Sequence, residues 1–563
     1  KFAEQIADIE AQETAYKDVQ LLLDPYKRIG NLLVARKMGW EIDNYYLQRI
    51  ATSIETSEIN LLSEIHEELL IKAEQVLENQ LPFYWELEFP QICFDALEDN
   101  KTKGFDIVVE NPPYLGGKSI SSELGDSFRK YLVSSFPPAI NNADLSSYFL
   151  RKAFDIITEN GYCGLVTTNT IAQGDSRETG LSIILQKQGR ITFAERFVKW
   201  PGEATVEVNL LSITKLSKNS DRKIFPLLDG QIVPQISSWL DDLPEIEIKK
   251  LQQNNDLAFQ GDVLRGSGFI ISSDQAQLLL HEDPKNSECI FPYLIGHDVN
   301  ENPQHKPSRW VICFHDWSKD RAKLYPEPFK ILLKKVKPTR DKVKQKKDRE
   351  NWWLFNSYRR GLREAIENLD CVLVRSRVSE YHMLAFLPKT QIFGDALVVF
   401  AFDDYYHFAL LQSWIHEIWL RRQASTMRTD IRYTPTDCFQ TFPFPQHPSQ
   451  STVNSAENAG KTYYEYRQHV LINAQKGLTD TYNQFHDPTC LDADMDKIRQ
   501  LHAEMDQAIL KCYDWEDIDL EHDFYPNDRG KIRYMPCRDA QREIYTRLIT
   551  LNHTIATEEA MRK

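Results

Sequence analysis

The stretch Phe105-Asp106-Ile107-Val108-Val109-Glu110-Asn111-Pro112-Pro113-Tyr114 decides the fold that this sequence predicts. Its apolar first half is typical of a short buried strand, and two consecutive prolines cannot continue one. We therefore expect the strand to end in a stiff loop that projects Asn111 and Tyr114 from its carboxyl edge. Open α/β sheets bind their ligands at that edge. The stretch thus predicts a ligand site as well as a strand.

The residue types in this loop suit the capture of a planar amino group. The exocyclic amine of adenine is a poor nucleophile, because its lone pair is delocalised into the ring. The Asn111 side-chain oxygen and the Pro112 carbonyl oxygen are acceptors that can bind both amine hydrogens and localise that lone pair. Tyr114 can stack on the face of the base. The plain alternative is a proline-rich turn with a capping asparagine.

Length and composition indicate a multidomain globular protein. The chain has 563 residues, of which 42% are apolar, and this length suggests about three or four domains. Its nine cysteines include no Cys-x-x-Cys pair, so no metal site or disulfide framework is expected and a reducing cytoplasm fits. No apolar run is long enough to span a membrane. The net charge of −15 argues against a nonspecific nucleic-acid coat, but the charge is unevenly distributed.

The hydrophobic period divides the chain into four regions. Residues 1–82 are expected to be helical, and the alternation over Phe83–Phe89 predicts a strand. An alternating β/α pattern over 83–222 predicts part of a Rossmann-like, doubly wound α/β sheet. Residues 223–448 are rich in aromatics and short strands and predict an α+β domain, and residues 449–563 are again helical. Within the sheet region the pattern predicts a helix over 146–159 and strands over 161–168, 191–198 and 206–214.

Two further loops are expected at the carboxyl edge of the same sheet. Asn169 and Gln173 follow the predicted strand over 161–168 and are candidates to line a base pocket, with loop filler as the alternative. Trp200 follows the strand over 191–198. A flipped base needs apolar walls on both faces, so Trp200 is a candidate for the wall opposite Tyr114, with a buried structural tryptophan as the alternative.

The residues after the proline loop resemble a phosphate-binding loop only in part. Gly116-Gly117-Lys118-Ser119 has the right ending, but Pro112 stands where the first glycine is required, and this excludes an ATP loop. We expect the glycines to give room beside a DNA strand, with Lys118 near a phosphate; a simple turn is the alternative. Asp144 precedes a predicted helix and is a candidate N-terminal cap.

A basic run marks the third region. Phe329–Arg349 holds ten Lys or Arg against two acidic residues, and Trp352-Trp353 follows directly. Such runs are usually solvated helix faces. Beside aromatic residues in an acidic protein, however, the run favours a surface that contacts phosphates. The candidate DNA-binding side chains here are Lys334, Lys335, Lys337, Arg340, Arg359 and Arg360.

Taken together, these motifs resemble the γ-class amino-methyltransferases that modify adenine N6 in DNA. The likeness is strongest to the large type IIG and type IIL restriction–modification enzymes and to the related DISARM and BREX phage-defence methyltransferases, and it covers nearly the whole chain. The matching segments are Trp85–Pro90, Phe105–Tyr114, Ala143–Leu145, Thr168–Gly174, Lys199–Ala204, Gly266–Phe269, Tyr293–Gly296, Arg428–Phe439, Phe442–Pro445 and Gly477–Asn483.

The resemblance implies an S-adenosylmethionine-dependent enzyme that flips an adenine into a pocket under Tyr114. Asn111, Pro112, Pro113 and Tyr114 would be catalytic, with Asn111 and Pro113 also next to the cofactor. Residues 1–82 would form a helical insertion and residues 223–448 a target-recognition domain that reads double-stranded DNA. Other subunits of a cytoplasmic defence system are further partners that the resemblance implies.

The resemblance also predicts residues that this chain does not contain. In the family, a glycine-rich cofactor loop and the acid that binds the cofactor ribose precede the catalytic strand. Only Gly30 and Gly39 precede Gly104 here, and both lie in helical surroundings. We therefore expect an N-terminal half that is omitted or lies on another polypeptide, and any nuclease domain would lie there too.

Three other functions remain open. A methyltransferase acting on a protein glutamine or an RNA base would share the Asn-Pro-Pro-Tyr loop but would not need a large recognition domain. A noncatalytic DNA-binding subunit would keep the loop as a relic. A combined methyltransferase–endonuclease would carry its nuclease upstream.

Overall fold

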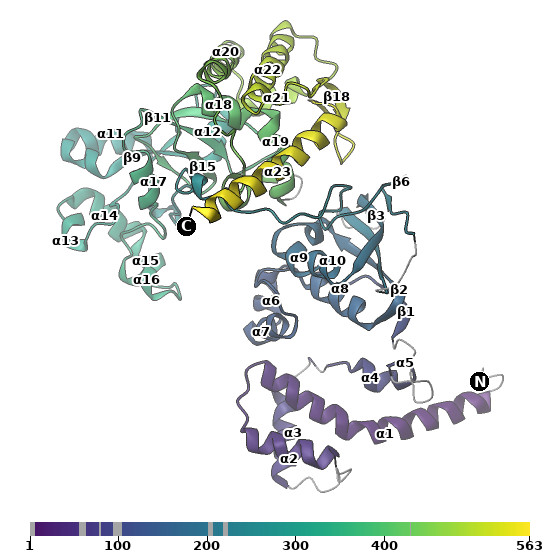
Figure 1. The fold of residues 1–563 in the computed structure, drawn as a ribbon. Coiled ribbons are helices and arrows are strands. Elements are labelled where there is room, and N and C mark those ends of the chain that lie inside the picture. The colour runs from purple at the N-terminus through teal and green to yellow at the C-terminus, as the bar shows by residue number, and fades with distance from the viewer. Residues whose placement is uncertain are drawn as a thin grey trace. The chain divides into compact units, whose positions relative to one another are not determined.

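The computed structural model describes residues 6–55, 64–77, 80, 82–93, 104–200, 207–217, 223–427 and 430–562. They belong to two compact units, Lys1–Glu245 and Ile246–Lys563 (Figure 1). Four predicted features lie partly outside the described residues: the helical region over 1–82, the Pro201–Ala204 part of one motif, the start of the strand over 206–214, and Arg428 and Thr429 of another motif. Within the ranges given above, no helix has the length and apolarity required to cross a membrane.

The first unit begins with the helical region that the sequence predicted. It contains α1 (Ile6–Lys37), α2 (Asn44–Glu55) and α3 (Glu64–Leu77). Leu32 of α1 and Leu70 of α3 lie in one small apolar core. Phe128 and Tyr131 of α7 (Asp126–Ser135) pack against the same core. The helical region is therefore attached to the sheet-bearing part through α7.

The prediction of a strand over Phe83–Phe89 was wrong. These residues contain the helical turn α4 (Trp85–Glu88), and α5 (Pro90–Cys93) follows it. A helical turn brings residues four apart onto one face, and the rings of Trp85 and Phe89 stack with centroids 5.9 Å apart. Both rings also meet Phe105, at 5.6 and 5.4 Å. Packing of this aromatic cluster therefore outweighs the alternating pattern.

A six-stranded mixed sheet carries the predicted loop. Its order is β1-β2-β4-β3-β5-β6, with β1 parallel to β2 and β4 antiparallel to both of its neighbours. The strands are β1 (Phe105–Glu110), β2 (Ile157–Thr168), β3 (Gly189–Lys199), β4 (Glu207–Lys215), β5 (Leu227–Leu228) and β6 (Gln231–Ile232). The four principal predicted strands of this sheet are thus confirmed, with β2 starting four residues early. Among the described strands, β1 lies at the edge.

Helices cover one face of this sheet (Figure 1), whereas a complete doubly wound fold carries helices on both faces. The helices on this sheet are α8 (Leu145–Ile156), α9 (Gly174–Thr179) and α10 (Leu181–Gln186). Phe154 of α8 and Ile184 of α10 pack against Cys163, Ile191 and Leu211 of the sheet. The opposite face of β1 exposes its apolar side chains, with Ile107 66% and Val109 78% exposed.

The first unit extends further along the chain than the predicted boundary at residue 222. Leu227 and Leu228 of β5 pair with Phe193 and Ala194 of β3, and the compact unit continues to Glu245. The residues after 222 therefore complete the first sheet before the second unit begins.

The second unit contains two four-stranded sheets, ordered β14-β9-β10-β8 and β13-β11-β15-β7, with the smaller sheets β12-β17-β16 and β18-β19. The strands are β7 (Ala258–Gln260), β8 (Ile270–Ile271), β9 (Ile290–Leu294), β10 (Arg309–Ile312), β11 (Cys371–Ser376), β12 (Val378–Ser379), β13 (Ala385–Pro388), β14 (Ile392–Phe393), β15 (Leu397–Phe400), β16 (Ser425–Met427), β17 (Asp430–Arg432), β18 (Asp523–Pro526) and β19 (Ile532–Met535). The short strands β7 to β17 thus form the α+β part that was predicted, whereas β18 and β19 interrupt the region over 449–563 that was expected to be helical.

Helices surround and follow these sheets. They are α11 (Ser273–Glu282), α12 (Gly296–Glu301), α13 (Lys319–Ala322), α14 (Pro326–Lys335), α15 (Lys337–Arg340), α16 (Lys346–Glu350), α17 (Arg360–Ala365), α18 (Tyr405–Gln412), α19 (Trp414–Gln423), α20 (Gln450–Ala474), α21 (Leu478–Phe485), α22 (Ala493–Cys512) and α23 (Arg538–Met561). The buried Arg467 of α20 donates hydrogen bonds to the Leu384 carbonyl and to Tyr482. The C-terminal helices therefore share one compact unit with the sheets.

Candidate active site

The Asn111–Tyr114 loop lies at the carboxyl end of β1, as the sequence predicted. Pro112 is buried, whereas Asn111, Pro113 and Tyr114 are exposed. The next residue is tied to the first turn of α8, because the Leu145 amide donates to the Leu115 carbonyl at 2.9 Å. The loop is thus anchored at both ends and presents its polar groups outward.

Tyr114 lies over the end of β2 and contacts Asn111. Its hydroxyl donates to Asn111 Oδ1 at 2.6 Å and lies 3.2 Å from the Val166 carbonyl oxygen. Burial raises the pKa of Tyr114, and the nearby Asp144 carboxylate raises it further, so the hydroxyl stays protonated near neutral pH. A carboxamide oxygen has two lone pairs. One accepts from Tyr114 and the other is available to a ligand donor.

Strand register brings the other predicted pocket residues to the same edge of the sheet. Thr168, the last residue of β2, pairs with Val208 of β4, and Val208 also pairs with Val198 near the end of β3. The carboxyl ends of β1, β2 and β3 therefore share one edge. The residues that follow these ends include Asn111, Tyr114, Asn169, Gln173 and Trp200.

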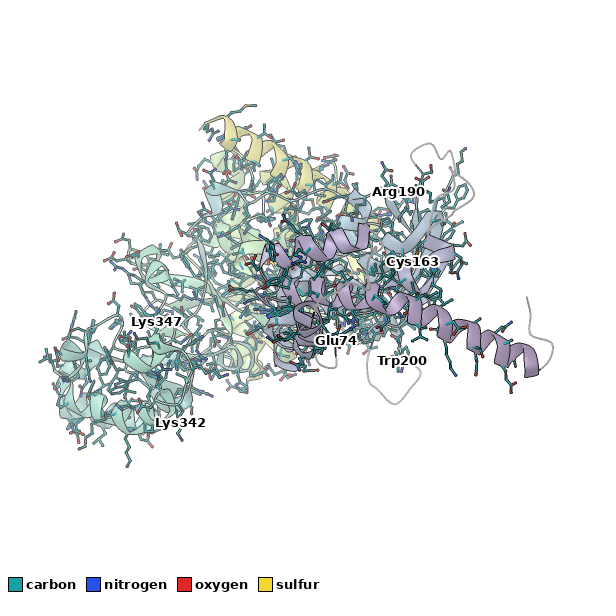
Figure 2. All side chains as sticks on the ribbon, turned by 90° about the horizontal axis from the view of Figure 1, so that it is seen from below. Glu74, Cys163, Arg190, Trp200, Lys342 and Lys347 are labelled. Atoms are coloured by element: carbon teal, nitrogen blue, oxygen red, sulfur yellow. The ribbon has the colours of Figure 1, made fainter. Side chains whose placement is uncertain are left out.

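Trp200 is exposed and does not lie in the core of the described residues. It is 37% exposed, as is Tyr114, and Figure 2 labels it on the first unit. The buried structural tryptophan that was the alternative is thus not what the structure shows.

Two residues near the loop have structural roles: Asp144 caps a helix and Gly117 allows close packing. The Asp144 side chain accepts from the Ser146 amide at 3.0 Å, so Asp144 caps α8 as expected. Gly117 begins α6 (Gly117–Glu123) and is buried. A Cβ there would lie 2.5 Å from the Asn142 backbone. Gly117 therefore serves close packing inside the unit, while Lys118 is exposed in the first turn of α6.

Sequence reasoning missed Asn209, a fully buried residue of β4. Its Nδ2 donates to Asn169 Oδ1 at 3.2 Å, and its Oδ1 accepts from the Phe197 amide at 3.1 Å. Phe197 lies in an irregular stretch of β3, between Glu195 and Val198. A carboxamide in the middle of the predicted strand over 206–214 was the only signal of this role, and the bulge that explains it was not visible in the pattern.

The basic segment of the second unit contains both exposed and internal cations. Lys334 and Lys335, at the end of α14, are exposed. Lys337 forms an ion pair with Asp341 at 2.7 Å. Within this basic segment, the exposed lysines for which the described residues offer no ion-pair partner are Lys334, Lys335, Lys342, Lys344 and Lys347, of which Figure 2 labels Lys342 and Lys347.

Three arginines of the predicted DNA-binding set have partners inside the protein. Arg340 is only 2% exposed, donates to the Leu264 carbonyl at 2.7 Å and lies 3.3 Å from Asp348. Arg359 is half-buried, and its amide donates to Asp262. Arg360 is exposed and pairs with Glu364 at 2.8 Å. The structure therefore gives Arg340 an internal role.

The two tryptophans beside the basic run do not form a surface with it. Trp352 and Trp353 are both buried in the apolar core that includes Phe269, Trp317 and Phe355. The Trp353 indole donates to the Trp317 carbonyl at 3.0 Å. The tryptophans pack in the core of the domain, so the expected DNA-contacting surface has no tryptophan from this pair and only its exposed lysines remain.

Two family models match this chain, one over most of each compact unit. Residues 7–192 match the Eco57I restriction-modification methylase family, and residues 245–446 match the target recognition domain of MmeI. The boundary between the two matched regions agrees with the division between the compact units.

The chain is also similar to three known proteins. DNA methyltransferase A of Bacillus subtilis (strain 168) is 21% identical over 88% of this chain and 56% of its own length. Adenine-specific methyltransferase BrxX of Escherichia coli O9:H4 (strain HS) is 31% identical over 18% of this chain and 8% of its own. The type IIL restriction-modification enzyme MmeI, solved in complex with DNA, shares the fold with a TM-score of 0.62 at 18% identity, over 80% of this chain and 57% of that one. The chain thus spans little more than half of the longest-matching relatives.

Proposed function

We propose that this chain provides the base-binding and sequence-reading parts of a site-specific DNA adenine-N6 methyltransferase that uses S-adenosylmethionine. The observation that carries the proposal is the exposed Asn111–Tyr114 loop at the sheet edge that also holds Trp200. A restriction–modification or phage-defence system is the setting that the matched families favour.

The loop would activate the amine by accepting its hydrogens. The free lone pair of Asn111 Oδ1 and the Pro112 carbonyl each take one N–H, which localises the nitrogen lone pair toward the reacting carbon. Tyr114 stacks on one face of the base and Trp200 on the other. No general base is needed before transfer, because the amine becomes acidic only as its fourth bond forms. Positioning and fixed dipoles supply most of the rate.

Asn111 and Pro113 would lie beside the reactive end of the cofactor, since they are exposed at the carboxyl edge of β1. S-adenosylmethionine, when bound, supplies an electrophilic methyl group. The remaining cofactor contacts are proposed to come from a segment or subunit that docks beside β1, which ends the described sheet.

The second unit would select the DNA sequence. MmeI is solved in complex with DNA and its recognition domain matches residues 245–446. In this chain the exposed lysines after Phe329 would grip phosphates, and side chains of the sheets and loops would read base edges in the major groove. Lys118 would add a phosphate contact beside the base pocket.

The test is methyl transfer from radiolabelled S-adenosylmethionine by the full protein, with any upstream segment or partner subunit, to duplex DNA, RNA and protein. The proposal expects label in duplex DNA only, recovered as N6-methyladenine after digestion. Label in RNA or in a protein glutamine would overturn the DNA assignment. DNA binding without transfer to any substrate would favour the noncatalytic subunit. Cleavage alongside methylation would identify a combined nuclease.

A further inference from the structure

A bulge in β3 leaves backbone amides that cannot pair with the neighbouring strand. The register shifts between Glu195 and Val198, and the amides in the shifted stretch donate to side chains instead. The Arg196 amide donates to Asp229 Oδ1 at 2.8 Å and the Phe197 amide to Asn209 Oδ1 at 3.1 Å. Phe197 has φ +56°, a left-handed conformation that is strained for an aromatic residue. Side-chain acceptors on both amides therefore hold the bulge in place.

The Phe197 amide also fixes the direction of the hydrogen bonds beyond it. A backbone N–H can only donate, so Asn209 must present its oxygen to Phe197 and its NH₂ group to Asn169. Asn169 must then present its own oxygen to Asn209, as the 3.2 Å separation shows. The NH₂ group of Asn169 is left on the other side of the carboxamide, away from the buried strand. Within the described part of the chain it has no hydrogen-bond partner.

We propose that Asn209 is a positioning residue that turns Asn169 into a hydrogen-bond donor for a ring nitrogen of the flipped adenine. This inference rests on the proposed function. The ring nitrogens of adenine are acceptors, whereas its amine is a donor. A pocket with acceptors at Asn111 and Pro112 and a donor at Asn169 therefore complements adenine. Guanine carries an acceptor in place of the amine and a donor at N1, so the same pocket rejects it.

The test combines variants of Asn209 with altered bases, using the full protein together with any upstream segment or partner subunit. N209D keeps an acceptor for Phe197 but attracts the Asn169 NH₂ group, so the Asn169 carboxamide turns over and offers the base an oxygen. The DNA substrates carry adenine, 1-deazaadenine, 3-deazaadenine or 7-deazaadenine at the target position, each analogue replacing one ring nitrogen with CH. The matched control is Ser212→Ala, which removes a side-chain hydrogen bond from Thr192 between the same two strands.

The expected result is that the separate losses in kcat/KM caused by N209D and by the base analogue do not multiply when the two are combined. The unmodified protein loses kcat/KM about tenfold or more on one analogue, and N209D loses a similar factor on adenine. On that same analogue N209D loses little more, because the hydrogen bond to the ring nitrogen is already absent. Ser212→Ala shows the full loss on the analogue and none on adenine. This pattern separates positioning of the donor from general damage, which would multiply the two losses.

Two results would overturn the inference. One is multiplicative losses in N209D, and the other is equal activity of the unmodified protein on all three analogues. If thermal unfolding shows that N209D does not fold, Asn169→Asp at the half-buried partner position replaces it, with the same expected pattern. If the unmodified protein methylates no DNA, the proposed function fails instead, and that outcome is read from the adenine substrate alone.

Discussion

The Asn111–Tyr114 loop and the basic segment over 330–349 were both identified from side-chain type, yet the structure uses them in different ways. In the loop, two prolines restrict the backbone, and the side chains of Asn111 and Tyr114 are exposed. In the basic segment, the backbone forms short helices, and each cation turns either to solvent or to an internal acceptor. Arg340 is buried while Lys342 is exposed. Backbone constraint therefore predicts the exposure of a side chain better than charge does.

The largest effect is expected at the loop. Asn111→Ala removes an acceptor for the amine and should lower the methylation rate about 10²–10³-fold, with an unchanged melting temperature because the side chain is exposed. Tyr114→Phe keeps the stacking ring but loses the hydrogen bond to Asn111, so it should lose far less. Single-turnover methyl transfer measures both. Equal losses in the two variants would contradict the role given to the carboxamide.

Arg340→Ala should unfold the second unit more readily rather than weaken DNA binding directly. Removing the guanidinium leaves the buried Asp348 carboxylate with fewer partners, at a cost of about 3 kcal/mol. Arg360→Ala is the matched control, since that side chain is exposed and its ion pair with Glu364 contributes little. Chemical denaturation of the two variants measures the difference. If the Arg340→Ala protein were stable but bound DNA weakly, Arg340 would be a phosphate-binding residue after all.

The exposed lysines should show the opposite behaviour. Replacing Lys342, Lys344 and Lys347 with alanine should weaken DNA binding about tenfold at moderate salt, and should reduce the slope of log affinity against log salt by about 0.9 for each phosphate that is no longer neutralised. Stability should not change. A triple alanine variant at Lys461, Lys476 and Lys511 alters the net charge equally and controls for it. Equal slopes in the two triple variants would show that this segment does not bind phosphates.

The smallest effect concerns Glu110, the residue before the loop. Burial raises the pKa of its carboxyl group above the ordinary value of 4.5, and its Oε1 has no hydrogen-bond partner within the described residues. The stabilisation that the protonated form provides is complete below pH 4.5 and is lost as the pH rises through the folded-state pKa. Glu110→Gln should therefore raise the melting temperature by about 1–2 °C at about pH 8, and the gain should vanish near pH 4.5. A gain independent of pH would exclude this explanation.

Prediction from sequence succeeded where a residue's position is set by its own backbone. The proline loop, the Asp144 cap and the principal strands of the first sheet are of this kind. It did not succeed where the role depends on distant partners. The alternation over Phe83–Phe89 predicted a strand, but these residues are helical and pack on Phe105. Trp352 is buried in a core that no local sequence pattern indicates. Asn209 depends on a bulge in another strand, so its link to Asn169 required the structure.

Among the described strands, β1 ends the sheet with an open edge, and this edge bears on how the chain behaves in solution. A strand with an unpaired row of backbone amides and carbonyls readily accepts another strand, and here Ile107 and Val109 add exposed apolar area beside that row. At high concentration, copies of the chain are expected to associate through this edge and precipitate. A segment that docks beside β1 would therefore cover this edge and keep the chain in solution, in addition to any contribution to cofactor binding.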